Sequence, residues 1–332
     1  MTKNFCPLTK TRSLFQKAIY LLLTGAFLFL AAGIQAQSKK IKTIIIDPGH
    51  GGSDTGTKGD YEGGLESKEK DVTLAISMKL VDLLRKRIPD VNTIPTRTTD
   101  TFMSVKEKAN FANEHHGDLF VCIHADAVLL KTGSRIIGYK NETYTTTKHV
   151  GKGKKRRRIV TKHTRRVPIR EYYKIPTSRK GTSTLILVAR QSSDKVKAME
   201  NSNMDFITDD GDSTANVNYD SPEWKASAIL YSQKYFRRSY QLANLVQDEV
   251  STITGRPNLG VWQREKGLWV LHATQMPAVL IETGFLVNYD DERYLNSEKG
   301  QQEIAEGICD AIIKYRDQVD GFSKTTAQSV NN

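Results

Sequence analysis

The stretch Lys42-Thr-Ile-Ile-Ile-Asp47, followed at once by Pro48-Gly-His-Gly-Gly52, decides the fold of this chain. Its first six residues form a short and nearly continuous apolar run, and the proline and glycines that follow bring the run to an end. A run of this kind is typical of a strand that is buried on both faces of a sheet. His50, within the Pro-Gly-His-Gly-Gly stretch, therefore stands just after the end of that strand.

Outward from this strand, helical and extended patterns alternate. Residues 53–66 are Gly-rich and charged, which indicates a loop, and Ser67 is a plausible N-cap for a helix that ends near Arg87. The next patterns predict a strand over 91–97, a short helix over 105–112 and a buried strand over 119–124. Further strands are predicted at 182–188 and 277–282, with helices at roughly 226–250 and 304–312. The alternation predicts an α/β fold, a single domain over 42–316 with a twisted, mostly parallel sheet flanked by helices.

The basic residues of the chain are concentrated in one segment. The whole chain has a net charge of +12, but residues 131–180 hold 17 Lys and Arg against only Glu142 and Glu171, so this segment carries +15 and the remainder −3. It interrupts the alternation and is predicted to be a basic insertion. Three interpretations stay open: a solvated hairpin, a surface for an anionic polymer or membrane headgroups, or a docking site for an activator protein. Nucleic acid is not expected as a partner, because the segment lacks a recognisable reading motif.

The two ends of the chain have the patterns of processed or unstructured segments. Residues 1–36 combine a basic leader, an apolar run from Ala18 and the small residues around Ala36, which predicts a signal peptide cleaved near Ala36 and export to the periplasm. An uncleaved anchor is the alternative. The polar tail 323–332 is predicted to be disordered. Cys122 and Cys309 are expected to be small buried residues rather than a disulfide or a metal site.

Three ionisable residues stand at the ends of predicted strands: His50, His124 and Glu282. Catalytic and ligand-binding groups gather at the carboxyl ends of strands in such sheets, and a buried charge there needs a partner such as a metal ion. Zinc favours two histidines with one carboxylate and an open position. The loop and helix start after His50 offer Glu62, Glu66 and Glu69, and spacing alone does not choose among them. Each of these residues could instead be a hydrogen-bonded or salt-bridged structural group.

Four stretches, in order, resemble the zinc-dependent N-acetylmuramoyl-L-alanine amidases, the type 3 amidase family of peptidoglycan hydrolases. These stretches are Ile44–Gly56, Glu69–Leu74, Asp118–Asp126 and Pro277–Asn288. The resemblance implies that His50, Glu69 and His124 bind zinc and that Glu282 is the catalytic glutamate. It implies hydrolysis of the amide bond between N-acetylmuramic acid and L-alanine, in cell-wall remodelling or daughter-cell separation, by a protein expected to be a monomer. Asp47 could orient His50 or cap the strand end.

The chain departs from the family pattern at several positions. Cys122 stands where a serine is usual, Asp126 where asparagine is frequent, Lys108 where arginine is usual and His272 where an arginine often follows Val-Leu. None of these changes removes an implied ligand, but Asp126 and His272 could alter substrate contacts.

The family resemblance also bears on regulation and on rival functions. In some relatives of the family, a segment between the second histidine and the last motif covers the zinc site until a partner moves it. Residues 195–225 occupy that interval here and are a candidate regulatory loop, in which Asp209 or Asp210 could contact the metal. The rival functions are another zinc peptidase that acts on cell-wall peptides, and a non-catalytic wall-binding protein.

Overall fold

The computed structural model describes residues 40–187, 222–264 and 268–328. Its contacts divide the chain into two units, residues 41–315 and a second unit made of 1–40 and 316–332. The predicted signal peptide and residues 195–221 of the candidate regulatory loop lie outside the described residues. All described strands belong to the first unit, which also contains the four stretches that resemble the amidase family.

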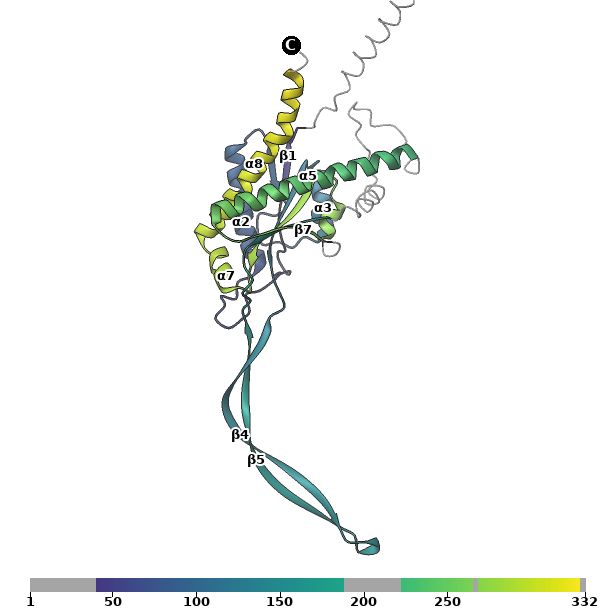
Figure 1. The fold of residues 1–332 in the computed structure, drawn as a ribbon, viewed down its shortest axis with the longest axis vertical. Helices are drawn as coiled ribbons and strands as arrows, with labels where there is room; N and C mark the ends of the chain where they lie inside the picture. Colours follow the sequence, from purple (N-terminus) through teal and green to yellow (C-terminus); the bar gives the residue numbers. More distant parts are fainter. Residues whose placement is uncertain (1–39, 188–221, 265–267, 329–332) are drawn as a thin grey trace, which may run out of the picture. The chain divides into compact units, whose positions relative to one another are not determined.

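A mixed six-stranded sheet, in the order β2-β1-β3-β8-β6-β7, forms the centre of this unit (Figure 1). The strands are β1 (Thr43–Pro48), β2 (Asn92–Pro95), β3 (Leu119–Asp126), β6 (Thr182–Leu187), β7 (Asn258–Arg264) and β8 (Ala278–Phe285). Neighbouring strands are parallel in every described pair except β6 with β8. The predicted single α/β domain with a mostly parallel sheet is confirmed, and β7 is an edge strand that the sequence patterns did not predict.

Alternating side chains of the sheet enter two different layers of the core. Ile45 packs with Phe120, Leu185 and Leu280 in a cluster that also contains residues of α3 (Val105–Glu114) and α6 (Trp269–Ala273). Ile44 and Ile46 point to the other face, because side chains alternate along a strand, and α2 (Glu69–Arg87) packs against β1, β2 and β3. Both faces are therefore covered, which explains why the β1 sequence is apolar at consecutive positions.

The remaining helices are α5 (Pro222–Thr254), α7 (Tyr289–Leu295) and α8 (Glu298–Gln328). Helix α5 packs on β6, where the side-chain amide oxygen of Gln247 accepts from Thr184 Oγ1 at 2.7 Å. Helices α6 and α7 were not predicted, and α8 extends into the segment for which disorder was expected, with residues 329–332 outside the described part. No helix within the described residues has the length and apolarity that a membrane span requires.

The expectation for the start of α2 was wrong in one detail. The N-cap is Lys68, without a side-chain cap, because the Ser67 hydroxyl donates instead to the buried carboxylate of Glu292. Glu292 also accepts hydrogen bonds from Tyr61 Oη and from the backbone of Leu65 and Ser67. This carboxylate thus holds the loop that leads into α2.

The basic insertion folds as a separate two-stranded antiparallel sheet of β4 (Lys131–Val150) and β5 (Arg157–Ile175). A short 3-10 turn, Gly153–Lys155, joins the strands. Most of their side chains are exposed, and Figure 1 shows the strands winding about each other. The hairpin shape named among the three interpretations is therefore present, and no strand of the insertion joins the central sheet.

Candidate metal centre and active site

The carboxyl ends of β1, β3 and β8 meet at one edge of the central sheet, as the parallel pairing requires. His124 lies on β3 and is the register partner of Glu282 on β8. His50 follows β1 by two residues. The three ionisable residues that the sequence places at strand ends are thus brought to the same edge.

The backbone at Gly49 packs directly against the His124 ring, which allows the His50 and His124 side chains to lie close together. A Cβ at Gly49 would lie 2.7 Å from the ring atoms of His124, so no larger residue fits while that ring keeps its place. His50 itself has a φ of 59°, in the left-handed region. Buried cations hold this turn, because Lys108 Nζ donates to the Pro48 carbonyl at 2.8 Å and Arg97 donates to the Gly49 carbonyl at 2.9 Å.

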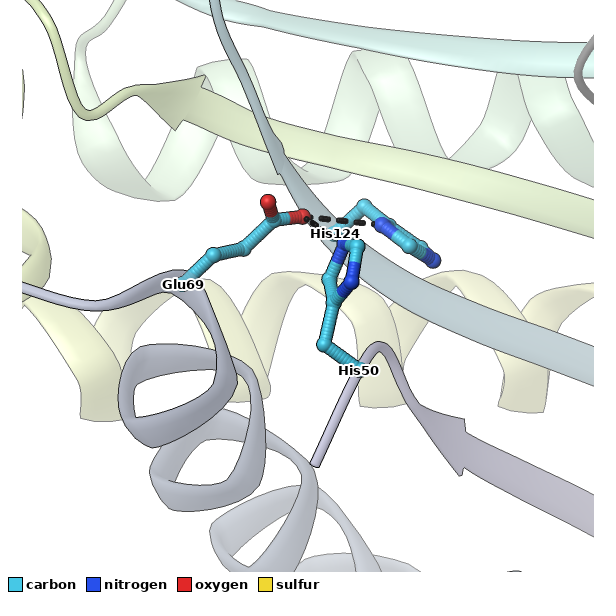
Figure 2. Close-up of side chains that lie close together, drawn as sticks. All are labelled: His50, Glu69 and His124. Atoms are coloured by element: carbon cyan, nitrogen blue, oxygen red, sulfur yellow. Dashed lines mark hydrogen bonds and ion pairs between the residues drawn. The ribbon is translucent and has the colours of Figure 1, made fainter. Parts of the chain in front are cut away.

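Glu69, the first residue of α2, completes the cluster (Figure 2). Its Oε1 lies 3.1 Å from His50 Nε2 and 2.8 Å from His124 Nδ1. The backbone N–H of Thr57 donates to Oε2 at 2.8 Å, and that of Ala125 donates to Oε1 at 3.1 Å. The carboxylate is therefore held in place by the backbone while one oxygen faces both imidazoles.

One ligand atom from each of His50, Glu69 and His124 lies within 4.8 Å of the others. This convergence selects Glu69 among the three glutamates that spacing left open. Glu62 instead forms an ion pair with Arg135 at the hairpin root, and Glu66 is exposed. Two imidazoles with one carboxylate form a donor set that could hold a divalent metal ion.

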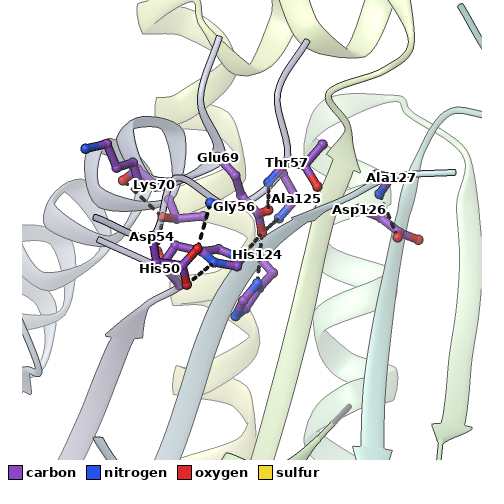
Figure 3. Close-up of polar contacts among 12 residues, drawn as sticks. His50, Asp54, Gly56, Thr57, Glu69, Lys70, His124, Ala125, Asp126 and Ala127 are labelled. Atoms are coloured by element: carbon purple, nitrogen blue, oxygen red, sulfur yellow. Dashed lines mark hydrogen bonds and ion pairs between the residues drawn. The ribbon is translucent and has the colours of Figure 1, made fainter. Parts of the chain in front are cut away.

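Asp54, not Asp47, orients His50 (Figure 3). Asp54 Oδ2 lies 2.8 Å from His50 Nδ1, and its other oxygen accepts from the Gly56 backbone at 3.0 Å. Asp47 points into the core, where Thr96 and Cys122 donate to it and Lys108 lies 2.9 Å away. The suggestion that Asp47 orients His50 is therefore wrong, because its side chain faces the interior below the turn.

The charges of the cluster shift the pKa values of its members. Burial acts to raise the pKa of Glu69, but hydrogen bonds with His124 and His50 outweigh it and hold that pKa well below the usual range. Burial acts to lower the pKa of His50, and the contacts with Glu69 and Asp54 more than reverse this effect. Glu69 is thus ionised at neutral pH and available as an anionic ligand.

Glu282 differs from Glu69 and Asp54 at this edge, because one of its carboxylate oxygens is buried without a hydrogen bond to any described residue. It is 8% exposed, and its Oε2 has no hydrogen-bond partner among the residues that the structure describes. Burial raises its pKa well above the usual value, and the negative charges of Asp126 and Glu69 raise it further. Such a group holds its proton to a higher pH than an exposed glutamate does.

His50, Glu69, His124 and Glu282 line one cavity of about 570 Å³. Asp126 also lines it, which supports the expectation that this departure from the family pattern meets the substrate region, whereas His272 lies on α6 and is not among the described lining residues. Arg264, at the end of β7, lines the cavity and acts to lower the pKa of Glu282. Sequence reasoning missed Arg264 because it missed β7.

A family model described as N-acetylmuramoyl-L-alanine amidase matches residues 44–314. The chain belongs to this amidase family. Every described strand of the amidase sheet except the first residue of β1 lies inside the matched range, and so does the basic hairpin.

Curated relatives include two amidases of Escherichia coli. AmiC of strain O6:H1 is 25% identical over 276 residues, which cover 82% of this chain but only 52% of AmiC. AmiA of strain K12 is 26% identical over 274 residues, which cover 82% of this chain and 76% of AmiA. This amidase-family chain therefore spans about half the length of AmiC and about three quarters of AmiA.

Among solved structures, the N-acetylmuramoyl-L-alanine amidase from Clostridium difficile 630 has a similar fold. The TM-score is 0.51 at 24% identity, and the alignment covers 84% of this chain and 98% of that one. At this identity the comparison supports the amidase fold of the central sheet and helices.

Proposed function

We propose that this chain is a zinc-dependent N-acetylmuramoyl-L-alanine amidase that hydrolyses the amide bond between N-acetylmuramic acid and L-alanine in peptidoglycan. The observation that carries the proposal is the convergence of His50, Glu69 and His124 in the cavity that is also lined by the buried carboxyl group of Glu282. Membership of the amidase family supports the choice of substrate.

The donor set fits zinc better than the hard cations. Calcium and magnesium bind mainly oxygen ligands, whereas a catalytic zinc ion takes histidine nitrogen and carboxylate oxygen and keeps one position open. His50 and His124 supply the nitrogens and Glu69 the oxygen. When bound there, zinc lowers the pKa of a water ligand and polarises the substrate carbonyl.

The residues of the chain supply the remaining parts of the reaction. Asp54 orients the His50 ring through its contact with Nδ1, which leaves Nε2 facing Glu69, and such a carboxylate–histidine contact fixes the ring position of a ligand. Glu282 accepts the proton of the attacking water as a general base and returns a proton to the leaving amine of L-alanine. Burial raises its pKa, which makes its carboxylate a stronger base than that of an exposed glutamate.

We also propose that the enzyme acts in the periplasm after removal of residues 1–36, in cell-wall remodelling or daughter-cell separation. Mass spectrometry of the protein recovered from the cell envelope tests the first part, since an N-terminus close to Gln37 is expected. Recovery of the intact leader would indicate the anchored alternative instead.

The activity is tested by digesting purified sacculi with the zinc-loaded protein and identifying the products by mass spectrometry. The expected products are intact stem peptides with a free L-alanine amine, together with glycan strands that keep free lactyl groups. Chelation of zinc, or His124→Asn, should abolish their release. His116→Asn is the matched control, because His116 is exposed and asparagine tolerates its positive φ.

Each rival function has its own outcome in this assay. Cleavage within the stem peptide would identify a peptidase of another specificity. Sedimentation with sacculi in the absence of any cleavage, with zinc bound, would identify a non-catalytic wall-binding protein.

A further inference from the structure

The two faces of the β4–β5 hairpin differ in where the carboxylates lie and in how the cations are arranged. Directly paired residues of an antiparallel sheet share a face and side chains alternate along each strand, so the register assigns every residue to one of two faces. The open face carries five cations of β5: Arg158, Lys162, Arg166, Arg170 and Lys174. The closed face carries six cations of the two strands together with both carboxylates of the hairpin, Glu142 and Glu171, which form ion pairs with Arg165 and Arg135.

The cations of the open face are regularly spaced. They recur at every fourth residue of β5, which keeps all five on one face and places neighbours about 13 Å apart. Among the described residues, no carboxylate lies within ion-pair distance of Arg158, Lys162, Arg166 or Arg170, whereas Lys174 pairs with Asp60 at the hairpin root. The register leaves no acidic residue on this face of either strand.

The open face is also the more exposed of the two. Every one of its paired residues is exposed, and all the partly buried residues of the two strands lie on the closed face. Tyr139 and Tyr172 are 53% and 68% exposed there, and Arg166 stacks over the Tyr139 ring at 4.3 Å. Several threonine hydroxyls of β4 share this face. It therefore offers cations, aromatic rings and hydroxyls to solvent along its length.

We propose that the open face binds the peptidoglycan sacculus and holds the enzyme on its insoluble substrate. This inference rests on the proposed function for the identity of the polymer. Peptidoglycan combines the carboxylates of its stem peptides with sugar rings and hydroxyl groups, which match regularly spaced cations, exposed tyrosines and threonines. The match is one of charge and chemistry along an extended polymer.

The chemistry of the hairpin tip favours this polymer over a membrane surface. Interfacial segments insert Trp, Phe or Leu below the headgroups, but the turn from Gly151 to Arg156 reads Gly-Lys-Gly-Lys-Lys-Arg and has no apolar side chain. The apolar side chains of the open face stand singly among polar ones. A hydrated polyanion is the better partner for such a surface.

The root of the hairpin is attached close to the catalytic edge. Strand β4 begins shortly after Asp126 and Ala127, which line the cavity. Arg135 pairs with Glu62, Lys174 pairs with Asp60, and the Glu62 backbone N–H donates to the Lys174 carbonyl at 3.0 Å. These contacts join the root to the loop that leads to Glu69. A glycan strand retained at the root would therefore lie near the group of His50, Glu69 and His124.

The test compares two variants with equal loss of charge. In the full chain carrying Glu282→Gln, which prevents digestion, the open-face variant combines R158Q, K162Q, R166Q and R170Q. The closed-face variant combines K131Q, K140Q, K148Q and R157Q, which lie on the opposite face and are also exposed. Co-sedimentation with purified sacculi over a range of salt concentrations gives the affinity of each.

The open-face variant should bind sacculi at least about tenfold more weakly than the parent, since each exposed ionic contact contributes a factor of about two to five. Its affinity should also depend less on salt, and the closed-face variant should stay within about threefold of the parent. Equal weakening of both variants, unchanged binding of the open-face variant, or a parent that does not sediment would overturn the proposal. Tighter binding to vesicles containing anionic phospholipid than to sacculi would overturn it in favour of a membrane.

A second measurement separates this proposal from the proposed function. With Glu282 intact, both variants should cleave a small soluble muramoyl-peptide at the rate of the parent, because the hairpin cations lie outside the cavity lining. Their rates on sacculi should differ in the order of their affinities. Absence of amide cleavage by the parent would contradict the proposed function, while the sedimentation results would still decide the role of the open face.

Discussion

The edge of the central sheet and the β4–β5 hairpin use charge in opposite ways. At the sheet edge, the buried carboxylates of Glu69 and Asp47 are each surrounded by donors drawn from distant parts of the chain. On the open face of the hairpin, Arg158, Lys162 and Arg170 stand in solvent without a carboxylate among the described residues. A buried charge requires a specific partner within the fold, whereas an exposed charge is solvated by water and remains available to bind a partner outside the chain.

This difference separates two kinds of function in one unit. The geometry of the sheet edge depends on long-range packing, so a single substitution there should have a large effect on the reaction or on folding. The hairpin depends on local strand pairing, and its several exposed cations contribute separately. Single substitutions there should therefore have small effects.

Glu69→Gln should remove zinc binding and with it the amidase activity. The amide supplies only a neutral oxygen to an ion that needs anionic or imidazole ligands, and it no longer balances the two histidines. Metal analysis after dialysis, with activity on a soluble muramoyl-peptide, measures the loss. Glu66→Gln is the matched control and should keep both metal and activity, because Glu66 is exposed in the loop just before α2. Equal losses in the two variants would contradict the assignment of Glu69.

Glu282→Gln should keep zinc but lower the turnover number by roughly 10²- to 10⁴-fold, the range expected for loss of a general acid–base group. The amide has a similar shape and cannot accept the proton of the attacking water. Steady-state kinetics on the soluble substrate, with metal content measured in parallel, distinguishes this variant from Glu69→Gln. Full turnover of the zinc-loaded variant would remove Glu282 from the mechanism.

The same substitution should change stability in a pH-dependent way in the zinc-free protein. Burial raises the pKa of Glu282 in the folded state above its unfolded value, so the parent loses stability as the pH rises from the unfolded pKa through the folded one. The variant lacks this titration. Its melting temperature relative to the parent should therefore be higher at pH 8 than at pH 4.5, and a pH-independent difference would contradict the buried charge.

The sequence was sufficient for the parts of this site that lie on continuous apolar strands. The runs before His50, before His124 and before Glu282 predicted β1, β3 and β8, and the parallel arrangement then brought their ends together. Spacing could not choose among Glu62, Glu66 and Glu69, because the choice depends on where the loop after His50 packs. The family resemblance implied Glu69, and of these three glutamates it is Glu69 whose oxygen lies close to both histidines in the structure.

Other structural features could not be predicted from the sequence, because their sequence signals are weak or because they depend on contacts between separate segments. Strand β7 contains polar residues on an exposed edge, so Arg264 at its end could not be placed in the cavity. Asp54 could not be recognised as the partner of His50, because that contact depends on a turn closed between Gly51 and Asp54. Strands β4 and β5 are rich in Thr, Val, Ile and Tyr, which favour strands, but the cations interleaved with them conceal a strand period.

Lys108→Met should destabilise the fold by about 3–5 kcal/mol, because it leaves a buried carboxylate without its cation. Lys108 is 4% exposed, and its Nζ lies 2.9 Å from Asp47 Oδ1 and also holds the Pro48 carbonyl before His50. Thermal unfolding should show a melting temperature lower by roughly 10 °C. Lys106→Met, at an exposed position of the same helix, should change it little.

A double variant separates this buried pair from simple loss of packing. Asp47→Asn combined with Lys108→Met removes both charges, so its destabilisation should be smaller than the sum of the two single effects. Strict additivity would show that the two side chains act independently, despite the distance between them.

Arg165→Gln provides the exposed counterpart of that experiment. Arg165 pairs with Glu142 at 2.7 Å on the closed face of the hairpin and stacks over Tyr144, yet both partners of the ion pair are largely open to solvent. Water screens the pair, and its loss should cost about 0.2–1 kcal/mol. Global thermal unfolding should shift by less than about 3 °C, while hydrogen exchange in β4 and β5 should increase. A loss of stability as large as that of Lys108→Met would show that the hairpin is coupled to the core, and the separation between a buried catalytic edge and an exposed binding face would then be wrong.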